Sequence, residues 1–146
     1  MRIVLAFMIG VAGLSIVSCS ADDRVSKSIG ASVNRGVGTR VALVEHATFA
    51  WDKACIFGPY TPDADIDAVT GVHGAATKAH GIQSRDDIEV LLFVHNGDIA
   101  ASVAHLRDRG DFGPELVGKC YSRHEAVFSV RKAPADSWGT IGPPSR

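Results

Sequence analysis

The most regular pattern of hydrophobic and polar positions lies between Ile88 and Leu106, where two apolar runs flank the pair Asn96–Gly97. Both residues accept the positive φ angles of a two-residue type I′ turn, so the pattern predicts a β-hairpin. If His95 pairs with Asp98, one face of the hairpin is wholly apolar and should belong to the core. The pairs expected on that face are Val94–Ile99, Leu92–Ala101 and Val90–Val103. The opposite face is mixed and is expected to be covered only in part: Glu89, Leu91, Phe93, His95, Asp98 and Ser102.

Shorter runs predict elements on either side of the hairpin. Strands are expected from Arg40 to Phe49, from Phe49 to Phe57 and from Ala126 to Lys132. A short helix is expected to begin at Thr61-Pro62-Asp63, with the threonine hydroxyl as its cap, and to end at Gly71. Residues 72–87 suit a further short helix or a loop, and residues 107–119 suit a loop. The sum is an α+β fold: a mostly antiparallel sheet of four or five short strands with one or two short helices on one face.

The amino-terminal segment has the pattern of a targeting signal. Arg2 precedes an uncharged apolar run that is shorter than the roughly 20 residues needed to span a bilayer. The run ends in Ile16-Val17-Ser18-Cys19, which resembles the lipobox of bacterial lipoproteins. That resemblance implies a signal peptide over 1–18, lipidation of the Cys19 thiol, cleavage before it, and acylation of the new amino terminus. It also implies anchoring in the outer membrane, since Ser20 follows the cysteine where aspartate would signal inner-membrane retention.

The rest of the chain divides by composition into three parts. Residues 19–38 combine the lipidated cysteine with a polar, small-residue segment, which is expected to be a flexible tether. Residues 39–133 are expected to form the single domain. Residues 134–146 contain several prolines and are expected to be an irregular tail.

Composition excludes some functions. The chain of 146 residues has 15 Lys and Arg against 16 Asp and Glu, and the basic residues are spread along the chain. A nucleic-acid partner is therefore not expected, because phosphate binding needs clustered positive charge.

Two cysteines, Cys55 and Cys120, remain after Cys19 is assigned to the anchor. In an oxidising compartment two thiols of one small domain usually pair, so a disulfide is favoured. The alternative is two unpaired thiols packed as small hydrophobic groups.

The densest cluster of chemically distinctive residues runs from Phe49 to Thr61. Its pattern, W-D-K/R, three residues, F, one residue, P-Y-T, resembles a segment of small, uncharacterised bacterial lipoproteins, a family that supplies no catalytic residues to carry over. Trp51, Asp52, Lys53 and Tyr60 are the candidate binding patch, because they set amphipathic rings beside opposite charges. The alternative is that the aromatic rings anchor the core while Asp52 and Lys53 fix a turn or a strand edge.

Catalytic and metal-binding motifs are weak. His73 and His80 lie seven positions apart, which on a helix is about 10 Å and too far for one shared ion. The chain has neither H-E-x-x-H nor a nucleophile elbow nor a phosphate-binding loop, and no spacing supports a triad from Ser122 and His124. No metal or other cofactor is predicted.

Two hypotheses of function follow from the sequence. The first is a non-enzymatic module, held at the membrane by its lipid, that binds another envelope protein, peptidoglycan or an external ligand. The second is a small envelope hydrolase whose histidine and carboxylate groups are brought together by folding. A deep cleft in which those groups converge would favour the enzyme, and a shallow aromatic patch would favour the binding module.

Overall fold

The computed structural model describes residues 21–135 and 137–145. The predicted signal peptide and Cys19 lie outside these residues. In chain order the elements are α1 (Ala21–Asn34), β1 (Arg40–Ala42), α2 (Leu43–His46), β2 (Lys53–Phe57), α3 (Asp63–Thr70), the 3₁₀ turns η1 (Ala75–Lys78) and η2 (Ile82–Ser84), β3 (Ile88–His95), β4 (Asp98–Leu106), the 3₁₀ turn η3 (Arg107–Arg109), β5 (Asp111–Phe112), β6 (Lys119–Ser122), β7 (Val127–Lys132) and β8 (Thr140–Gly142).

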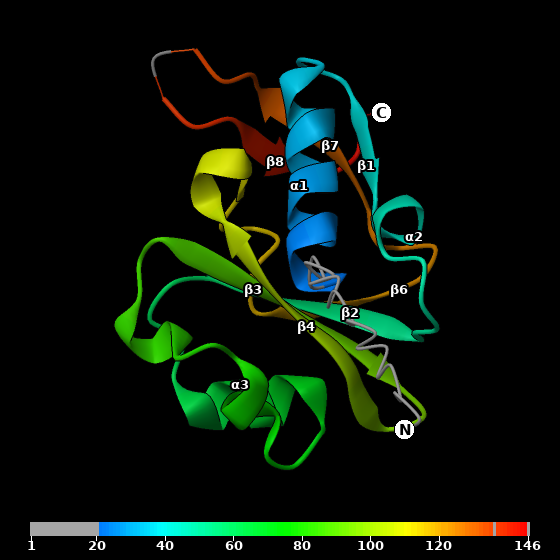
Figure 1. The fold of residues 1–146 in the computed structure, drawn as a ribbon, viewed down its shortest axis with the longest axis vertical. Helices are drawn as coiled ribbons and strands as arrows, with labels where there is room; N and C mark the ends of the chain where they lie inside the picture. Colours follow the sequence, from blue (N-terminus) through cyan, green and yellow to red (C-terminus); the bar gives the residue numbers. More distant parts are fainter. Residues whose placement is uncertain (1–20, 136, 146) are drawn as a thin grey trace, which may run out of the picture.

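The strands form two sheets, one of which is buried on both faces. The antiparallel sheet β4-β3-β2-β6 is the central layer. One of its faces packs on α3, η1 and η2, and the other on α1 and the second sheet, β1-β7-β8-β5, in which only β5 and β8 run parallel. Figure 1 shows α3 on one side of the central sheet and α1 on the other. The α+β class and the mostly antiparallel pairing are thus confirmed, with eight strands in two sheets within the described residues.

The predicted tether is wrong where it overlaps α1. Val25, Ile29 and Val33 recur every four residues along this helix and are 3%, 0% and 0% exposed. One apolar residue per turn makes a narrow stripe, which the polar residues around it conceal in the sequence. The stripe packs into the core shared by the two sheets, so the domain begins well before residue 39.

The hairpin turn is confirmed, but the register beyond it differs from the prediction. Asn96 and Gly97 have φ angles of 50° and 80°, and the pairs His95–Asp98 and Val94–Ile99 are present. A β-bulge between Phe93 and Val94 then shifts the register, so that Phe93 pairs with Ala101.

The shift exchanges the faces of β4. Val103 lies opposite Leu91 and Ala104 opposite Val90, so the predicted pairs Leu92–Ala101 and Val90–Val103 are wrong. The face expected to be covered only in part is buried at Glu89, Leu91 and Phe93. Its other residues are less covered, since His95 and Ser102 are half-buried and Asp98 is exposed.

The other predicted helices and strands lie where they were expected, but several begin or end at other residues. The strand expected from Arg40 ends at Ala42 and gives way to α2, and the following strand begins at Lys53. Helix α3 spans the expected residues and ends at Gly71 with a φ of 70°, but the Thr61 hydroxyl donates to the Gly58 carbonyl instead of capping the helix. The expected loop over 107–119 contains β5, and the expected irregular tail contains β8.

Candidate functional site

Two residues of the predicted patch, Trp51 and Asp52, support the fold. Trp51 is 2% exposed, donates its indole N–H to the Ala47 carbonyl and lies beneath the Arg123 guanidinium, 4.8 Å from the ring centroid. Asp52 accepts from the Asn96 backbone N–H at 2.7 Å, which lowers the pKa of this carboxyl and secures the hairpin turn. These contacts match the alternative interpretation, in which the aromatic ring anchors the core and the charge fixes a turn.

The four residues are not brought together. Lys53 donates to the Thr70 carbonyl at the end of α3, at 2.7 Å. Trp51 precedes β2 and Tyr60 follows it, so the strand separates the two rings. The predicted patch has two aromatic residues, and of these only Tyr60 is largely exposed, with 60% of its surface accessible.

Cys55 and Cys120 form a disulfide. They are opposite each other in the register of β2 and β6. The bond ties β6, at the edge of the sheet, to β2, the strand beside it among the described residues.

Tyr60 stands at the edge of an apolar hollow. Its backbone has a φ of 62°, which is unusual for an aromatic residue, and its N–H donates to the Ile82 carbonyl at 3.0 Å. The hollow measures about 460 Å³ and is lined mainly by apolar side chains, among them Phe57, Pro62 and Val117. This site uses the segment that the sequence singled out, though only its carboxyl-terminal half.

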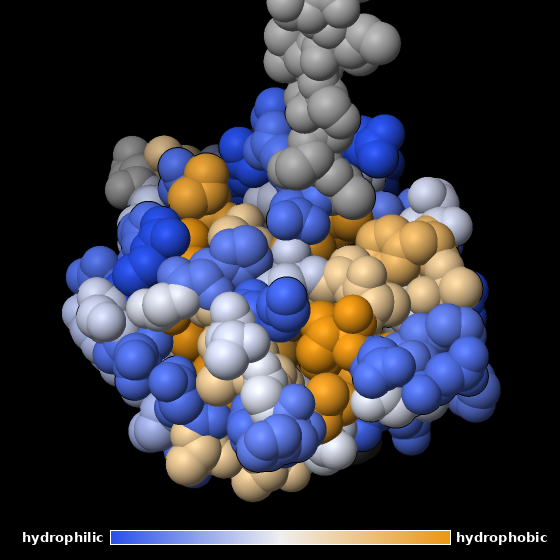
Figure 2. All heavy atoms as spheres, turned by 60° about the horizontal axis from the view of Figure 1, so that its bottom comes forward, coloured by the Kyte–Doolittle hydropathy of each residue, from blue (hydrophilic) through white to orange (hydrophobic). Residues whose placement is uncertain are grey.

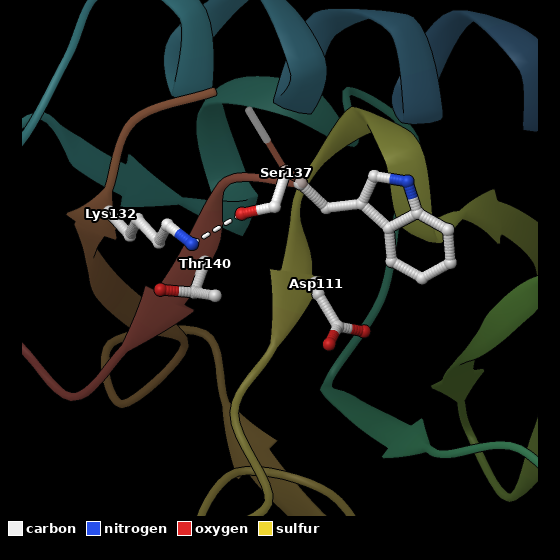
Figure 3. A pocket seen from close by; sticks show the side chains of 5 residues that line it. Asp111, Lys132, Ser137 and Thr140 are labelled. Atoms are coloured by element: carbon white, nitrogen blue, oxygen red, sulfur yellow. Dashed lines mark hydrogen bonds between the residues drawn. The ribbon is translucent and has the colours of Figure 1, made fainter. Parts of the chain in front are cut away.

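A second hollow, of about 310 Å³, surrounds Trp138, which is 45% exposed. Its polar lining comes from β5, β7, β8 and the loop before β8, as Figure 3 shows, and consists of Asp111, Lys132, Ser137 and Thr140. The Lys132 ammonium donates to the Ser137 hydroxyl. The sequence did not point to Trp138, because a single tryptophan in a proline-rich tail carries no motif.

Arg107 joins these groups. Its guanidinium carbon lies 4.9 Å from the centre of the Trp138 ring, and its nitrogens donate to both Asp111 oxygens at 2.6 and 3.1 Å. The two hydrogen bonds raise the pKa of Arg107, so the cation is permanent. Ring, guanidinium and carboxylate therefore hold one another in place.

A third, smaller hollow of about 170 Å³ lies between the other two. It shares Pro59 and Val117 with the Tyr60 hollow and Asp111 with the Trp138 hollow, so the three adjoin. Glu89 lines it although the residue is only 1% exposed. Burial raises the pKa of Glu89 to about 9, and its carboxyl oxygen accepts from the Phe112 N–H at 2.8 Å.

We call these adjoining hollows the Tyr60–Trp138 surface. Within the described part of the chain, Tyr60 and Trp138 are the only large aromatic residues with exposed side chains. Tyr60 lines the hollow at one end of this surface, and Trp138 lines the hollow at the other end. On the face shown in Figure 2, hydrophobic side chains reach the surface as patches between hydrophilic ones. Exposed aromatic rings beside concave surface are typical of binding sites.

A separate hollow of about 340 Å³ adjoins α1 and α2 and contains a serine–histidine pair. The Ser28 hydroxyl lies 2.7 Å from His46 Nδ1, whereas His46 Nε2 is buried and has no hydrogen-bond partner among the described residues. Burial lowers the pKa of His46, which keeps the imidazole neutral near pH 7. Arg24 and Glu45 also line this hollow.

A second serine–histidine pair is closed to solvent. Ser26 Oγ lies 3.1 Å from His105 Nδ1, and His105 Nε2 lies 2.7 Å from the Gly110 carbonyl. Both residues are 0% exposed, and burial lowers the pKa of His105 to about 4. Arg109 donates to Ser26 and to Asp23, so this network attaches α1 to the segment after β4.

The other candidate catalytic and metal-binding residues from the sequence do not come together in a site. No cluster of three or more metal-ligating side chains occurs in residues 21–135 and 137–145. The Ser122 backbone N–H donates to the Glu125 carboxylate, which lowers the pKa of Glu125. His80 lies 3.3 Å from the Ser102 carbonyl and belongs to none of the hollows.

Comparison with protein-family models, with curated proteins and with solved structures finds no match. Within the described residues no helix has the length and apolar character needed to cross a membrane. The lipobox resemblance therefore stays a prediction from the sequence.

Proposed function

We propose that the protein is a lipid-anchored binding module of the bacterial envelope, which holds its partner on the Tyr60–Trp138 surface. Anchoring follows from the lipobox at Ile16–Cys19, and two or three acyl chains on one residue would make it permanent. The domain would then face the periplasm from the outer membrane.

One observation carries the binding role: two exposed aromatic rings terminate a row of adjoining hollows. Exposed aromatic side chains are costly in water and are the side chains that most often anchor a partner. Arg107 holds Trp138 and Asp111 in fixed positions, so this end of the surface is ordered before a ligand arrives.

The test is photo-crosslinking in living cells, with a photoreactive phenylalanine analogue at position 60, 138 or 37. Val37 is the matched control, because it is a hydrophobic residue with 68% exposure that lines none of the hollows. We expect crosslinked products from positions 60 and 138 and none from position 37. Equal yields from all three positions, or none from 60 and 138, would reject the binding surface.

Anchoring is tested separately by the intact mass of the mature protein. We expect an acylated amino terminus at Cys19, and complete loss of acylation and of cleavage in Cys19→Ala. An unmodified terminus at any residue after Ser18 would refute the anchor and leave the binding surface to be judged by the crosslinks.

The Ser28–His46 pair favours a second candidate, the small hydrolase. A neutral imidazole within hydrogen-bond distance of a serine hydroxyl is the arrangement that activates a nucleophile. A fluorophosphonate probe tests this by forming a bond to an activated serine oxygen as fluoride leaves. Mass mapping should place the label on Ser28 and not on Ser26, the buried counterpart on the same helix, and absence of label on Ser28 would dismiss the enzyme.

A further inference from the structure

We propose that the ligand of the Tyr60–Trp138 surface is a glycan chain of N-acetylated sugars, with Trp138 and Tyr60 each stacking on a sugar ring at one end of the bound segment. This inference rests on the proposed binding function and adds the chemical class of the ligand.

The Trp138 hollow has the groups that a sugar requires. Its potential donors are the Lys132 ammonium, which also donates to Ser137, and the hydroxyls of Ser137 and Thr140. Its acceptor is the Asp111 carboxylate, whose oxygens also accept from Arg107. Sugar hydroxyls act as donors and as acceptors, so they can satisfy this mixed lining in a way that a purely apolar ligand cannot. The exposed indole offers an aromatic face to the C–H groups of a pyranose ring.

The Tyr60 hollow complements the other part of the same ligand. Its apolar lining, which includes Phe57, Val69 and Val117, suits the methyl group of an acetamide. Asp65 and Thr61 at the same hollow supply polar atoms for the amide and the hydroxyls. The left-handed backbone of Tyr60 is of the kind found at ligand-binding clamps.

The dimensions favour a chain over a single sugar. The two outer hollows, of about 310 and 460 Å³, each lie within the range of small-ligand pockets, whereas the central one, of about 170 Å³, does not. The central hollow shares lining residues with both outer ones, so it offers a path for a ligand that fills both.

The experiment is calorimetric titration of the full-length protein in detergent with N-acetylglucosamine and its β-linked oligomers of increasing length. We expect the affinity to rise by at least about tenfold from the single sugar to the longest oligomer. Trp138→Ala should weaken binding of every length by roughly fivefold or more, while Trp138→Phe, which keeps an aromatic ring, should retain most of the affinity. Val37→Ala is the control and should bind as the wild type does.

Tyr60→Asn gives the sharper result. Asparagine tolerates the left-handed backbone, so the variant removes the ring and keeps the local fold, which an unchanged melting temperature would verify. It should weaken binding of long oligomers only. Affinity that does not depend on length, or an equal loss for every length, would overturn the chain-spanning ligand.

Failure of this inference differs from failure of the proposed function. Crosslinks from positions 60 and 138 to proteins, without binding of any oligomer, would reject the glycan and keep the binding module. Absence of both crosslinks and oligomer binding would reject both. Binding of a peptide or of lipid vesicles in place of the oligomers would also overturn the glycan.

Discussion

At the scale of single residues, the most unusual group is Glu89, a carboxyl buried beside Asp111 and Arg107. Burial raises its pKa from 4.5 to about 9, so it is protonated in the folded chain at neutral pH. Between those pH values the unfolded chain releases this proton, and rising pH therefore favours unfolding. The free energy of unfolding therefore falls by up to about 1.4 kcal/mol for each unit by which the pH rises.

Glu89→Gln should remove that dependence. Glutamine keeps an oxygen that can accept from the Phe112 N–H and cannot ionise. We expect the free energy of unfolding of the variant to exceed that of the wild type by a margin that grows from pH 5 to pH 8. Urea titrations at several pH values measure it, and parallel pH profiles for the two proteins would show that Glu89 is ionised when folded.

At the same scale, the sequence identified some site residues and not others. Tyr60 was found because it follows a dense aromatic motif. Trp138, Glu89 and Arg107 were not, since their roles depend on contacts between β3, η3 and the loop before β8. For Trp51 the sequence left two interpretations open, and the buried ring, which lies before β2, matches the one in which it anchors the core.

At the scale of elements, the hairpin shows how far turn chemistry determines register. Asn96–Gly97 sets the first two pairs correctly, but the bulge beyond Val94 depends on both faces of β3 being covered, which the turn does not encode. Helix α1 was missed because its single apolar stripe resembles isolated residues in a polar tether.

Gly97→Val tests the turn itself. Gly97 has a φ of 80°, which valine adopts only with strain, so we expect a loss of more than about 1 kcal/mol of unfolding free energy. Gly58→Ala is the control, because Gly58 has no positive φ and an added Cβ would make an ordinary contact with Val117 at 3.6 Å. Equal effects of the two changes would mean that the turn conformation is not responsible.

Ile29→Ala tests whether α1 belongs to the domain. Ile29 is fully buried, so its truncation should cost about 2–5 kcal/mol of unfolding free energy. Val37→Ala, at an exposed position just after the helix, should change it by less than about 0.5 kcal/mol. If chemical denaturation gives the same small effect for both, residues 21–34 are a tether after all.

At the scale of the whole molecule, the Cys55–Cys120 disulfide closes a long loop around the hairpin and one wall of the Tyr60 hollow. We expect neither cysteine to react with a thiol reagent in denatured, unreduced protein. The chain-entropy model puts the contribution of this bond at about 4 kcal/mol, so Cys120→Ser should lower the melting temperature markedly. Two free thiols in the count would contradict the bond.

If the proposed function is correct, a partner covers the Tyr60–Trp138 surface in the envelope. Amide hydrogen exchange tests it without any substitution, by comparing the protein in isolated envelopes with the purified protein in detergent. We predict slower exchange around residues 58–62, 107–112 and 137–140 in envelopes, and unchanged exchange around Val37. Equal exchange in the two samples over those three segments, or protection confined to other parts of the domain, would contradict the account.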